Sequence, residues 1–557
     1  MKKLMCLVCL WSLTVLIFAQ GSLESNTYGI PISDKVIEIE GGLIKGVPSD
    51  TEGVTVYKGV PFAAPPVGEL RWKAPQAVTP WEGVKTCNTW PAMPAQDKSG
   101  NKPGVSFYGD EFYFDPDRDV PVSEDCLYMN IFVPNGALTE KNAKYPIYFY
   151  THGGGNDHGF ASKSEFNAAK MAEKGIIVVV TLYRLGAFGF LALPKLTAEN
   201  GFTGNFALLD LIKGLEWVNQ NIAAFGGDKD NVTIGGQSAG CMNTRSLLSS
   251  SLADGLYNRA ILQSGFSSDF TSYKPLAIET AYEASRKSID TTFGKGTTIE
   301  DLRAMDASAF LDINVIKSFI AKSKTAVLDE VVLKSSNLNL IESKRLDDKQ
   351  IIIGGTSNEM TGLVGVSTKL ISKDDFYNSL KKTFTEDFCS NYNLEEIFPF
   401  NEGLQANADL LSVSSISFLI NTRRNMMNTA KNFPCYVYFF DQDLPPHKEG
   451  TVNKDESVYG AFHSSELWYT FNSLRNQEGQ RIWTKNDFNL ADTVSSYWVN
   501  FIKSGNPNGE NLPGWPTCTE LNDGTYMSFN NGKAVPSTRF TNNEKELFFR
   551  NSIKWEN

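Results

Sequence analysis

The sequence predicts an α/β fold with a mostly parallel central sheet flanked by helices. Short apolar strands alternate with helical stretches through the middle of the 557-residue chain, an order typical of parallel sheets with helical crossovers. Several of these strands are apolar at nearly every position, as in sheets that helices cover on both faces. The chain has no Pro-, Ser- or Gly-rich linker and no internal repeat, which favours one large domain with loop insertions.

Six segments have the composition of buried strands, and the clearest helix lies among them. The helix is expected over 206–225, where apolar residues recur at three- and four-residue spacing. Sites in open parallel sheets form beyond the carboxyl ends of the strands, so the residues that follow each strand are the first candidates for function. The expected strands are 147–151, 176–182, 232–234, 260–262, 351–353 and 436–440.

Residues 1–19 have the pattern of a secretory signal peptide, which leaves a single domain over 20–557. Lys2 and Lys3 precede an uncharged, mostly apolar stretch that ends at the small residue Ala19, the order found in cleaved signal peptides. An uncleaved anchor is the alternative, although the stretch is short for a bilayer span. We therefore expect a secreted or periplasmic protein without stable membrane insertion.

The charge pattern excludes one class of partner. The net charge is −11, with acidic and basic residues interspersed, whereas nucleic-acid binding needs a basic face. We expect no nucleic-acid partner, no cofactor and no metal ion; the oligomeric state stays open.

A candidate nucleophile lies in "NVTIGGQSAGCM", where Gly236, Ser238 and Gly240 form the chain's one G-x-S-x-G match. Chance alone gives about 0.3 such matches in a chain of this composition. A strand ending at Ile234 and a helix beginning near Ala239 would place Ser238 on a sharp turn with its hydroxyl exposed. The alternative is an ordinary helix N-cap serine.

A more specific motif, "THGGGNDHG", follows the expected strand 147–151. Consecutive glycines leave backbone N–H groups unshielded, so that they can converge, with the N–H of Ala239, on an oxygen that becomes negative during acyl transfer. A phosphate-binding loop is the rival interpretation, but its Lys-Ser/Thr ending and the G-x-G-x-x-G spacing are both missing. The motif favours an oxyanion hole.

The general base is sought among four histidines, His152, His158, His447 and His463. In α/β-hydrolases the order along the chain is serine, acid, histidine, which leaves the last two. His447 lies in the polar, proline-containing segment "DLPPHKEG", where we expect it to be solvated. His463 lies among aromatic and small residues, which favours it as the base.

The acid that orients the base is predicted to be Glu359. It follows the strand and glycine turn in "IIIGGTSNEMTG" and lies between Ser238 and His463 in the chain, as the order requires. Taken alone, a solvated loop carboxylate is the simpler interpretation of this residue.

With these residues in place, the sequence resembles the type-B carboxylesterase/lipase family, the cholinesterase-like branch of the α/β-hydrolases. The resemblance covers nearly the whole mature chain and implies the α/β-hydrolase fold. It rests on "VYKGVPFAAPPVGELRWKAPQ" from Val56, "SEDCLYMNIFVP" from Ser123, "LYRLGAFGFL" from Leu182, "GNFALLDLIKGLEWVNQNIAAFGGDKDNVTIGGQSAG" from Gly204, "ILQSG" from Ile261 and "YWVNFIKSGNPN" from Tyr497.

The resemblance implies a role for each site residue. Ser238 would be the nucleophile, Glu359 the acid and His463 the base, while the N–H groups of Gly154, Gly155 and Ala239 would form the oxyanion hole. Ser264 in "ILQSG" matches a serine that supports the site without reacting.

The resemblance also implies a disulfide between Cys87 and Cys126, which is compatible with export. Spacing alone does not fix this pairing. Four other cysteines have no evident partner in the sequence, and we expect them to be small buried apolar residues: Cys241, Cys389, Cys435 and Cys518.

Gln237 departs from the best-known members, which have Glu before the nucleophile. The change removes a negative charge, and no tryptophan lies between Pro91 and Cys126 to hold a cation over its ring. A neutral ester is therefore the expected small-molecule substrate. The aromatic segment "SFYGDEFYF" from Ser106 would favour bulky aromatic esters if its rings line the site, but these rings could equally be packing residues.

The predicted function is a secreted serine carboxylesterase that works through an acyl-enzyme intermediate. A lipase acting on acylglycerols is one alternative. A non-catalytic binding or adhesion protein on the same fold is the other, because fold alone does not define activity.

Overall fold

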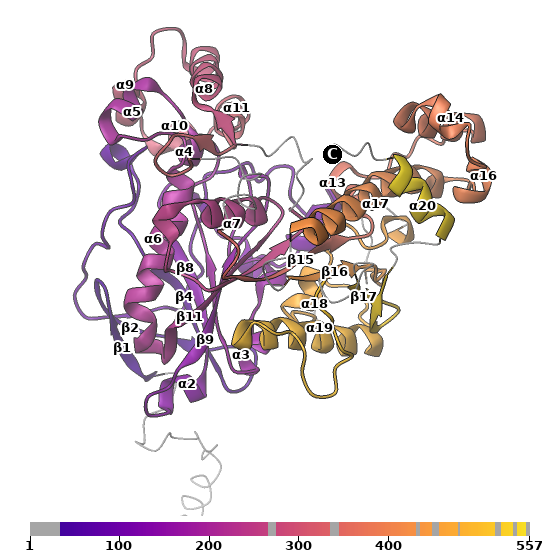
Figure 1. Cartoon of the computed structure of the whole chain (residues 1–557). Coiled ribbons are helices and arrows are strands. Elements are labelled where there is room, and N and C mark those ends of the chain that lie inside the picture. The colour runs from indigo at the N-terminus through magenta and orange to yellow at the C-terminus, as the bar shows by residue number, and fades with distance from the viewer. Residues whose placement is uncertain are drawn as a thin grey trace, which may run out of the picture.

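An 11-stranded sheet forms the centre of the part of the chain that the computed structural model describes, namely 34–265, 275–334, 345–429, 435–447, 456–476, 479–518, 525–538 and 543–552 (Figure 1). In order across the sheet, its strands are β18 (Lys533–Ser537), β17 (Tyr526–Asn530), β16 (Cys435–Phe440), β15 (Gln350–Thr356), β12 (Arg259–Gln263), β11 (Gly227–Gln237), β9 (Tyr145–Thr151), β10 (Ile177–Thr181), β8 (Tyr128–Pro134), β4 (Val54–Pro61) and β3 (Val47–Pro48).

The sheet is parallel in its centre and antiparallel at its two sides. Neighbouring strands from β10 to β17 pair in parallel, whereas β10–β8, β8–β4, β4–β3 and β17–β18 are antiparallel. The mostly parallel sheet predicted from the sequence is thus confirmed. Parallel pairing brings the carboxyl ends of the central strands to one edge.

All six expected strands are present, but one prediction about them is wrong. β11 does not end at Ile234 and instead continues to Gln237, because Gly235, Gly236 and Gln237 still pair with β12. The expected helix over 206–225 is α6 (Phe206–Asn221) followed by a 3-10 turn, Ile222–Phe225. Gly226, with φ of 78°, ends this turn.

Helices cover both faces of the sheet, which explains why its central strands are apolar throughout. Ile147 and Phe149 of β9 belong to the same core cluster as Trp217 of α6. Tyr148 and Tyr150, which alternate with them, belong to the opposite cluster, on the side of α19 (Lys485–Ser504). Successive strand residues point to opposite faces, so both sets are buried.

Shorter elements surround this core. Three small sheets join β1 (Val36–Ile39) with β2 (Gly42–Lys45) and β5 (Val84–Thr86), β6 (Met93–Pro94) with β7 (Val122–Ser123), and β13 (Leu276–Ala277) with β14 (Val327–Leu328). The remaining α-helices are α1 (Phe107–Phe112), α2 (Asn135–Thr139), α3 (Ala169–Glu173), α4 (Gly186–Phe190), α5 (Pro194–Asn200), α7 (Ala239–Ser249), α8 (Ile278–Phe293), α9 (Ile299–Ala304), α10 (Ala307–Phe310), α11 (Ile313–Ser318), α13 (Glu359–Val364), α14 (Lys373–Phe384), α15 (Glu386–Cys389), α16 (Leu394–Ile397), α17 (Leu404–Thr429), α18 (Leu467–Thr470) and α20 (Asn543–Ser552).

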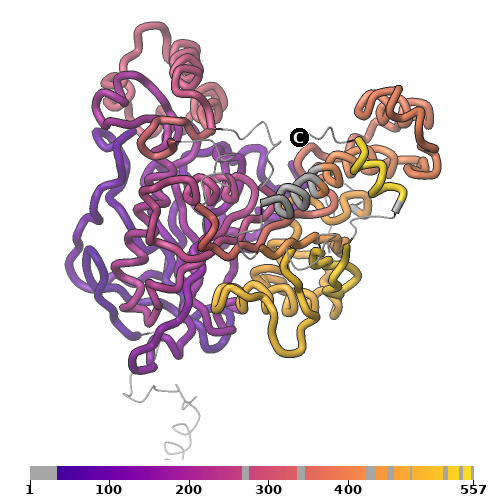
Figure 2. Tube along the Cα trace, viewed as in Figure 1, coloured from indigo at the N-terminus to yellow at the C-terminus, as the bar shows by residue number. Residues whose placement is uncertain are grey.

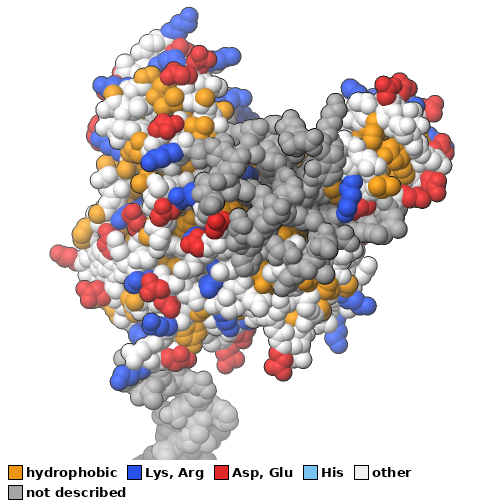
Figure 3. Space-filling model, viewed as in Figure 1, with side chains coloured by type: hydrophobic (Ala, Val, Ile, Leu, Met, Phe, Trp, Pro, Cys, Tyr) orange, Lys and Arg blue, Asp and Glu red, His pale blue; other side chains and the backbone are white. Residues whose placement is uncertain are grey.

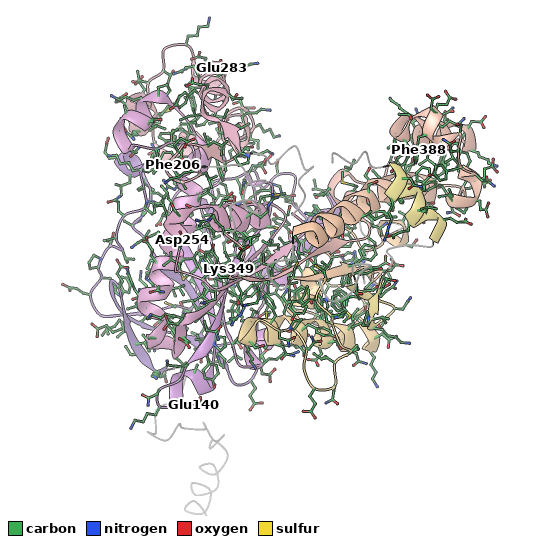
Figure 4. All side chains as sticks on the ribbon, in the orientation of Figure 1. Glu140, Phe206, Asp254, Glu283, Lys349 and Phe388 are labelled. Carbon is green, nitrogen blue, oxygen red and sulfur yellow. The ribbon has the colours of Figure 1, made fainter. Side chains whose placement is uncertain are left out.

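Two groups of helices project beyond the sheet, as the tube view makes plain (Figure 2). One contains α5 and α8 to α11 at the upper left, where Glu283 is labelled, and the other contains α14 and α16 at the upper right, near Phe388 (Figure 4). Charges of both signs are interspersed over the face in Figure 3. None of the helices in the described residues is long and apolar enough to cross a membrane. The predicted signal peptide, 1–19, lies outside these residues.

Candidate active site

The sheet brings the predicted site residues to one edge although they are far apart in the sequence. The glycine motif follows β9, Ser238 follows β11 and Glu359 follows β15. His463 lies on a loop that is held to the end of β15, where Asn358 N–H donates to the carbonyl of Ala461 at 3.0 Å. Gly153, Gly154, Gly155, Ser238 and His463 line one cavity.

Ser238 occupies a strained turn between β11 and α7. Its φ of 58° lies in the left-handed region, which non-glycine residues rarely adopt, and strain of this kind is typical of nucleophile turns. Strand and helix approach so closely that a Cβ atom on Gly240 would lie 2.1 Å from the carbonyl oxygen of Thr151. The glycine predicted at this position is therefore required by the packing.

The loop after β9 contributes three consecutive glycines to the lining of the cavity. Gly154 has φ of 115°, and a Cβ atom there would lie 2.1 Å from the carbonyl oxygen of His158. Within the described residues, no acceptor is hydrogen-bonded to the N–H of Gly154 or Gly155. The N–H of Ala239 is among those that the first turn of α7 leaves without an intrahelical acceptor.

Glu359 and His463 form a buried pair. His463 Nδ1 donates to Glu359 Oε2, and the other carboxylate oxygen accepts from Thr356 N–H at 2.9 Å. Burial alone would raise the pKa of Glu359, but His463 and the N–H of Thr356 hold that pKa below its ordinary value. The carboxylate stays charged and fixes the imidazole with Nε2 as its acceptor nitrogen.

In this structure Nε2 of His463 is hydrogen-bonded to Gln237 rather than to Ser238. The Gln237 Nε2 amide donates to it at 3.1 Å, and no Ser238 Oγ–His463 hydrogen bond is formed. The sequence placed Gln237 beside the nucleophile but gave no sign of this contact. For Ser238 to transfer its proton to His463, the amide must first move away.

A second buried carboxyl group, which sequence reasoning missed, lies behind the pair. Glu466 is fully buried and accepts from Gln263 Nε2 at 3.3 Å. Burial and the negative charge of Glu359 raise the pKa of Glu466 to about 8. Only one of the two carboxyl groups is therefore ionised at neutral pH. In the sequence, the position of Glu466 three residues after His463 was the one sign that this residue lies near the site.

The cavity is small and has an aromatic wall. Its volume of about 300 Å³ is at the low end for small-molecule sites. Tyr108, Phe112 and Tyr113 line it, so rings of the segment that begins at Ser106 do reach the site. Two rings of this segment also pack against the rest of the protein: Phe107 stacks on Tyr459 with ring centroids 4.0 Å apart, and Phe112 stacks on Trp468 at 5.9 Å.

The other histidines have different partners. His447 was expected to be solvated, and that prediction is wrong: its side chain is 6% exposed, and Nε2 lies 3.1 Å from Glu111 Oε2. His152 is buried and stacks on Tyr183 at 4.7 Å, and burial lowers its pKa to about 3. His158 Nδ1 lies 2.6 Å from Asp157 Oδ1. None of these three contacts Glu359.

The cysteines of the described residues are all buried and free. The bond predicted between Cys87 and Cys126 is not formed in this structure, and the pairing stays a prediction. Cys435 and Cys518, for which the sequence offered no partner, lie side by side: Cys518 N–H donates to the carbonyl of Cys435 at 2.9 Å. The neighbouring Cys518 thiol, together with burial, raises the pKa of Cys435.

The described part of the chain contains no group of three or more His, Cys, Asp or Glu side chains that could hold a metal ion. The site combines a serine on a strained turn, a buried Glu–His pair and a glycine loop with unpaired N–H groups, which are residue types that nucleophilic acyl transfer uses. Fold and site together define an α/β-hydrolase.

Comparison with known proteins gives the family within this class. The Carboxylesterase family matches residues 33–548, and the chain belongs to it. Carboxylesterase 1C of Rattus norvegicus is 30% identical over 508 residues, which cover 88% of this chain and 89% of that protein. Liver carboxylesterase 1 of Oryctolagus cuniculus is 30% identical over 547 residues, covering 89% and 90%.

The solved structures agree. A PNB esterase superposes with a TM-score of 0.68 at 25% identity, covering 90% of this chain and 97% of that one. The protein is therefore a carboxylic ester hydrolase that acts on small-molecule esters.

Proposed function

We propose that this protein hydrolyses neutral carboxylic esters by a serine mechanism with an acyl-enzyme intermediate. The observation that carries the proposal is the buried Glu359–His463 pair, whose imidazole lines the same cavity as Ser238. A histidine held in this tautomer is the usual base for an otherwise unreactive hydroxyl.

In the proposed first step, Ser238 Oγ attacks the ester carbonyl carbon while His463 Nε2 takes the hydroxyl proton. The carbonyl oxygen becomes negative, and the N–H groups of Gly154, Gly155 and Ala239 stabilise it. The bond to the alcohol then breaks, and the imidazolium gives its proton to the leaving oxygen. Glu359 stabilises the imidazolium throughout.

In the second step, water attacks the acyl-enzyme. His463 takes a proton from the water, the same backbone donors stabilise the second oxyanion, and Ser238 leaves with the proton. The carboxylic acid is released. Both steps require Gln237 to give up its hydrogen bond to His463 Nε2.

A neutral substrate is favoured because Gln237, beside the nucleophile, carries no charge, and because Tyr108, Phe112, Tyr113 and Phe166 line the cavity with aromatic rings. Export of the protein, secreted or periplasmic, is part of the proposal and rests on the pattern of residues 1–19. Mass spectrometry of the amino terminus of the exported protein tests it, and an amino terminus at Met1 would contradict cleavage.

The decisive variant is Ser238→Ala. If the triad acts as a unit, kcat for p-nitrophenyl butyrate falls by about a million-fold. Retention of more than a tenth of the wild-type rate would overturn the assignment, as would failure of a fluorophosphonate to label the Ser238 peptide. A rise in rate above the solubility limit of the substrate would instead indicate a lipase.

A further inference from the structure

The loop that supplies the oxyanion glycines also carries a charged pair into the cavity. Lys163 and Glu165 follow Gly155 in this loop and line the same cavity as Ser238 and His463. Both side chains are largely buried, with exposed fractions of 11% for Lys163 and 1% for Glu165. Burying two charged groups is costly unless they have good partners, so their contacts are informative.

The two groups are attracted to each other but leave polar capacity unused. Lys163 Nζ lies 3.6 Å from Glu165 Oε1, which is longer than the usual 2.7 to 2.9 Å of a charge-assisted hydrogen bond. In the described residues, Glu165 Oε2 has no hydrogen-bond partner, and the polar neighbour of the Tyr113 hydroxyl is Lys163. Tyr113 also lines the cavity, and its ring centroid lies 4.8 Å from Lys163 Nζ.

The position of the pair is fixed before any ligand arrives. On one side of Lys163, Gln96 exchanges two hydrogen bonds with Gly159, at 2.8 and 2.9 Å. Arg118 also donates to the carbonyl of Ser162 on that side at 3.0 Å, and on the other side Ser164 Oγ donates to Asp115 at 3.1 Å. A site held in this way binds without paying for the ordering of its loop.

Charge complementarity selects the chemical class of the ligand. A carboxylate group on the ester substrate would be attracted to Lys163 but repelled by Glu165. An ammonium group would be attracted to Glu165 but repelled by Lys163. A hydroxyl group adds no charge, accepts from Lys163 and donates to Glu165. Burial raises the pKa of Glu165 to about 7, and its carboxyl group remains a hydrogen-bond partner for a hydroxyl in either protonation state.

We propose that Lys163, Glu165 and Tyr113 form a hydroxyl-binding subsite, so that the enzyme prefers esters whose acyl or alcohol part carries a hydroxyl group. The proposal rests on the serine esterase function proposed above and names its substrate class. The aromatic rings of Phe112 and Phe166 complete this side of the cavity without competing for hydrogen bonds.

The test compares two pairs of esters that differ by hydroxyl groups alone. p-Nitrophenyl 3-hydroxybutyrate against p-nitrophenyl butyrate probes the acyl side, and 2,3-dihydroxypropyl butyrate against propyl butyrate probes the alcohol side. We expect kcat/KM to favour the hydroxylated ester by about tenfold or more in one pair, the effect of a hydrogen bond to a charged group. Ratios within twofold of unity in both pairs would overturn the proposal.

Variants assign the preference to the subsite. Lys163→Met and Glu165→Leu should each reduce the ratio to nearly one, because each removes every hydrogen-bonding atom of its side chain, and Tyr113→Phe should reduce it partly. If Lys163→Met does not fold, the Glu165→Leu result decides. A preference that survives Glu165→Leu would contradict the assignment.

Lys324→Met is the matched control. This lysine lines the same cavity, but its Nζ already contacts Asp157 Oδ2 at 2.6 Å, so the ratio should stay within twofold of wild type. If the wild-type protein hydrolysed none of these esters and was not labelled by a fluorophosphonate, the serine mechanism itself would be refuted. Failure of the proposed function is thus distinguishable from failure of the hydroxyl-binding subsite.

Discussion

Two buried glutamate–histidine pairs occur in the described part of this protein, and they differ in what else each glutamate binds. Glu359 has one charged partner, His463. Glu111 has two, because Arg481 Nη2 lies 2.7 Å away in addition to His447 at 3.1 Å, and Trp468 Nε1 donates to it as well at 2.7 Å. A Glu–His contact is therefore not in itself a sign of catalysis.

The cavity is what separates the two pairs. His463 lines it together with Ser238, whereas neither His447 nor Glu111 is among its lining residues. Arg481 and His447 outweigh the effect of burial and lower the pKa of Glu111 to about 2. The Glu111 cluster has the features of a structural ion pair, and the Glu359 pair has those of a proton-transfer site.

The histidines give the largest expected difference between the pairs. His463→Gln should lower kcat by about a million-fold, since it removes the base for Ser238. His447→Gln should leave kcat within about threefold. Steady-state kinetics with p-nitrophenyl butyrate measures both, and comparable losses in the two variants would mean that the pairs are functionally coupled.

Substitution of the two glutamates should also separate the pairs, one variant by its loss of activity and the other by its loss of stability. Glu359→Gln should lower kcat by about ten-thousand-fold, because the histidine loses its preferred tautomer. Glu111→Gln should instead lower the free energy of unfolding by about 3 to 5 kcal/mol, because Arg481 is left buried without its charge partner. Urea unfolding and kinetics on both variants test this, and a stable Glu111→Gln protein would contradict the structural role.

The pH dependence of stability should separate Glu111 from Glu466. The pKa of Glu111 is lowered from 4.5 to about 2, so its stabilisation is complete above pH 4.5 and is lost as the pH falls through 2. The pKa of Glu466 is raised from 4.5 to about 8, so the folded state loses stability as the pH rises through that interval.

Both predicted directions, the loss of stability at acid pH and the loss as the pH rises toward 8, can be tested by measuring the free energy of unfolding across the pH range. Glu111→Gln should flatten the loss at acid pH, and Glu466→Gln should flatten the loss between pH 4.5 and 8. A Glu466→Gln profile parallel to that of the wild type would show that this carboxyl group ionises normally.

Gln237 gives the smallest expected effect. Gln237→Ala removes the amide that occupies His463 Nε2, so kcat/KM should rise by about two- to tenfold, the value of one hydrogen bond. A fall in kcat/KM would show that the amide assists catalysis.

The sequence was most informative where a local rule fixes a residue. The central strands are covered on both faces, so each read as an apolar run and was predicted within a few residues. The glycines beside Ser238 were recognisable because close packing permits no side chain there. Chain order limited the base to His447 and His463, and the position of Glu359 after a strand, between Ser238 and His463, favoured it as the acid.

Other features depend on side chains that only the fold brings together. His447 was predicted to be solvated because its neighbours in the sequence are polar, whereas its partner Glu111 is 336 residues away in the chain. The hydrogen bond from Gln237 to His463 spans 226 residues. Lys163 and Glu165 gave no signal, because charged residues in a loop are usually solvated.

The short helix α1 links the cavity wall to both glutamate–histidine pairs. Tyr108 donates to the backbone carbonyl of His463 at 3.0 Å, Phe112 lines the cavity, and Glu111 holds Arg481 and His447. An engineer who wishes to alter substrate range therefore cannot exchange this segment as an independent module. If α1 were replaced without the partners of Glu111, both the position of His463 and the aromatic wall of the cavity would change.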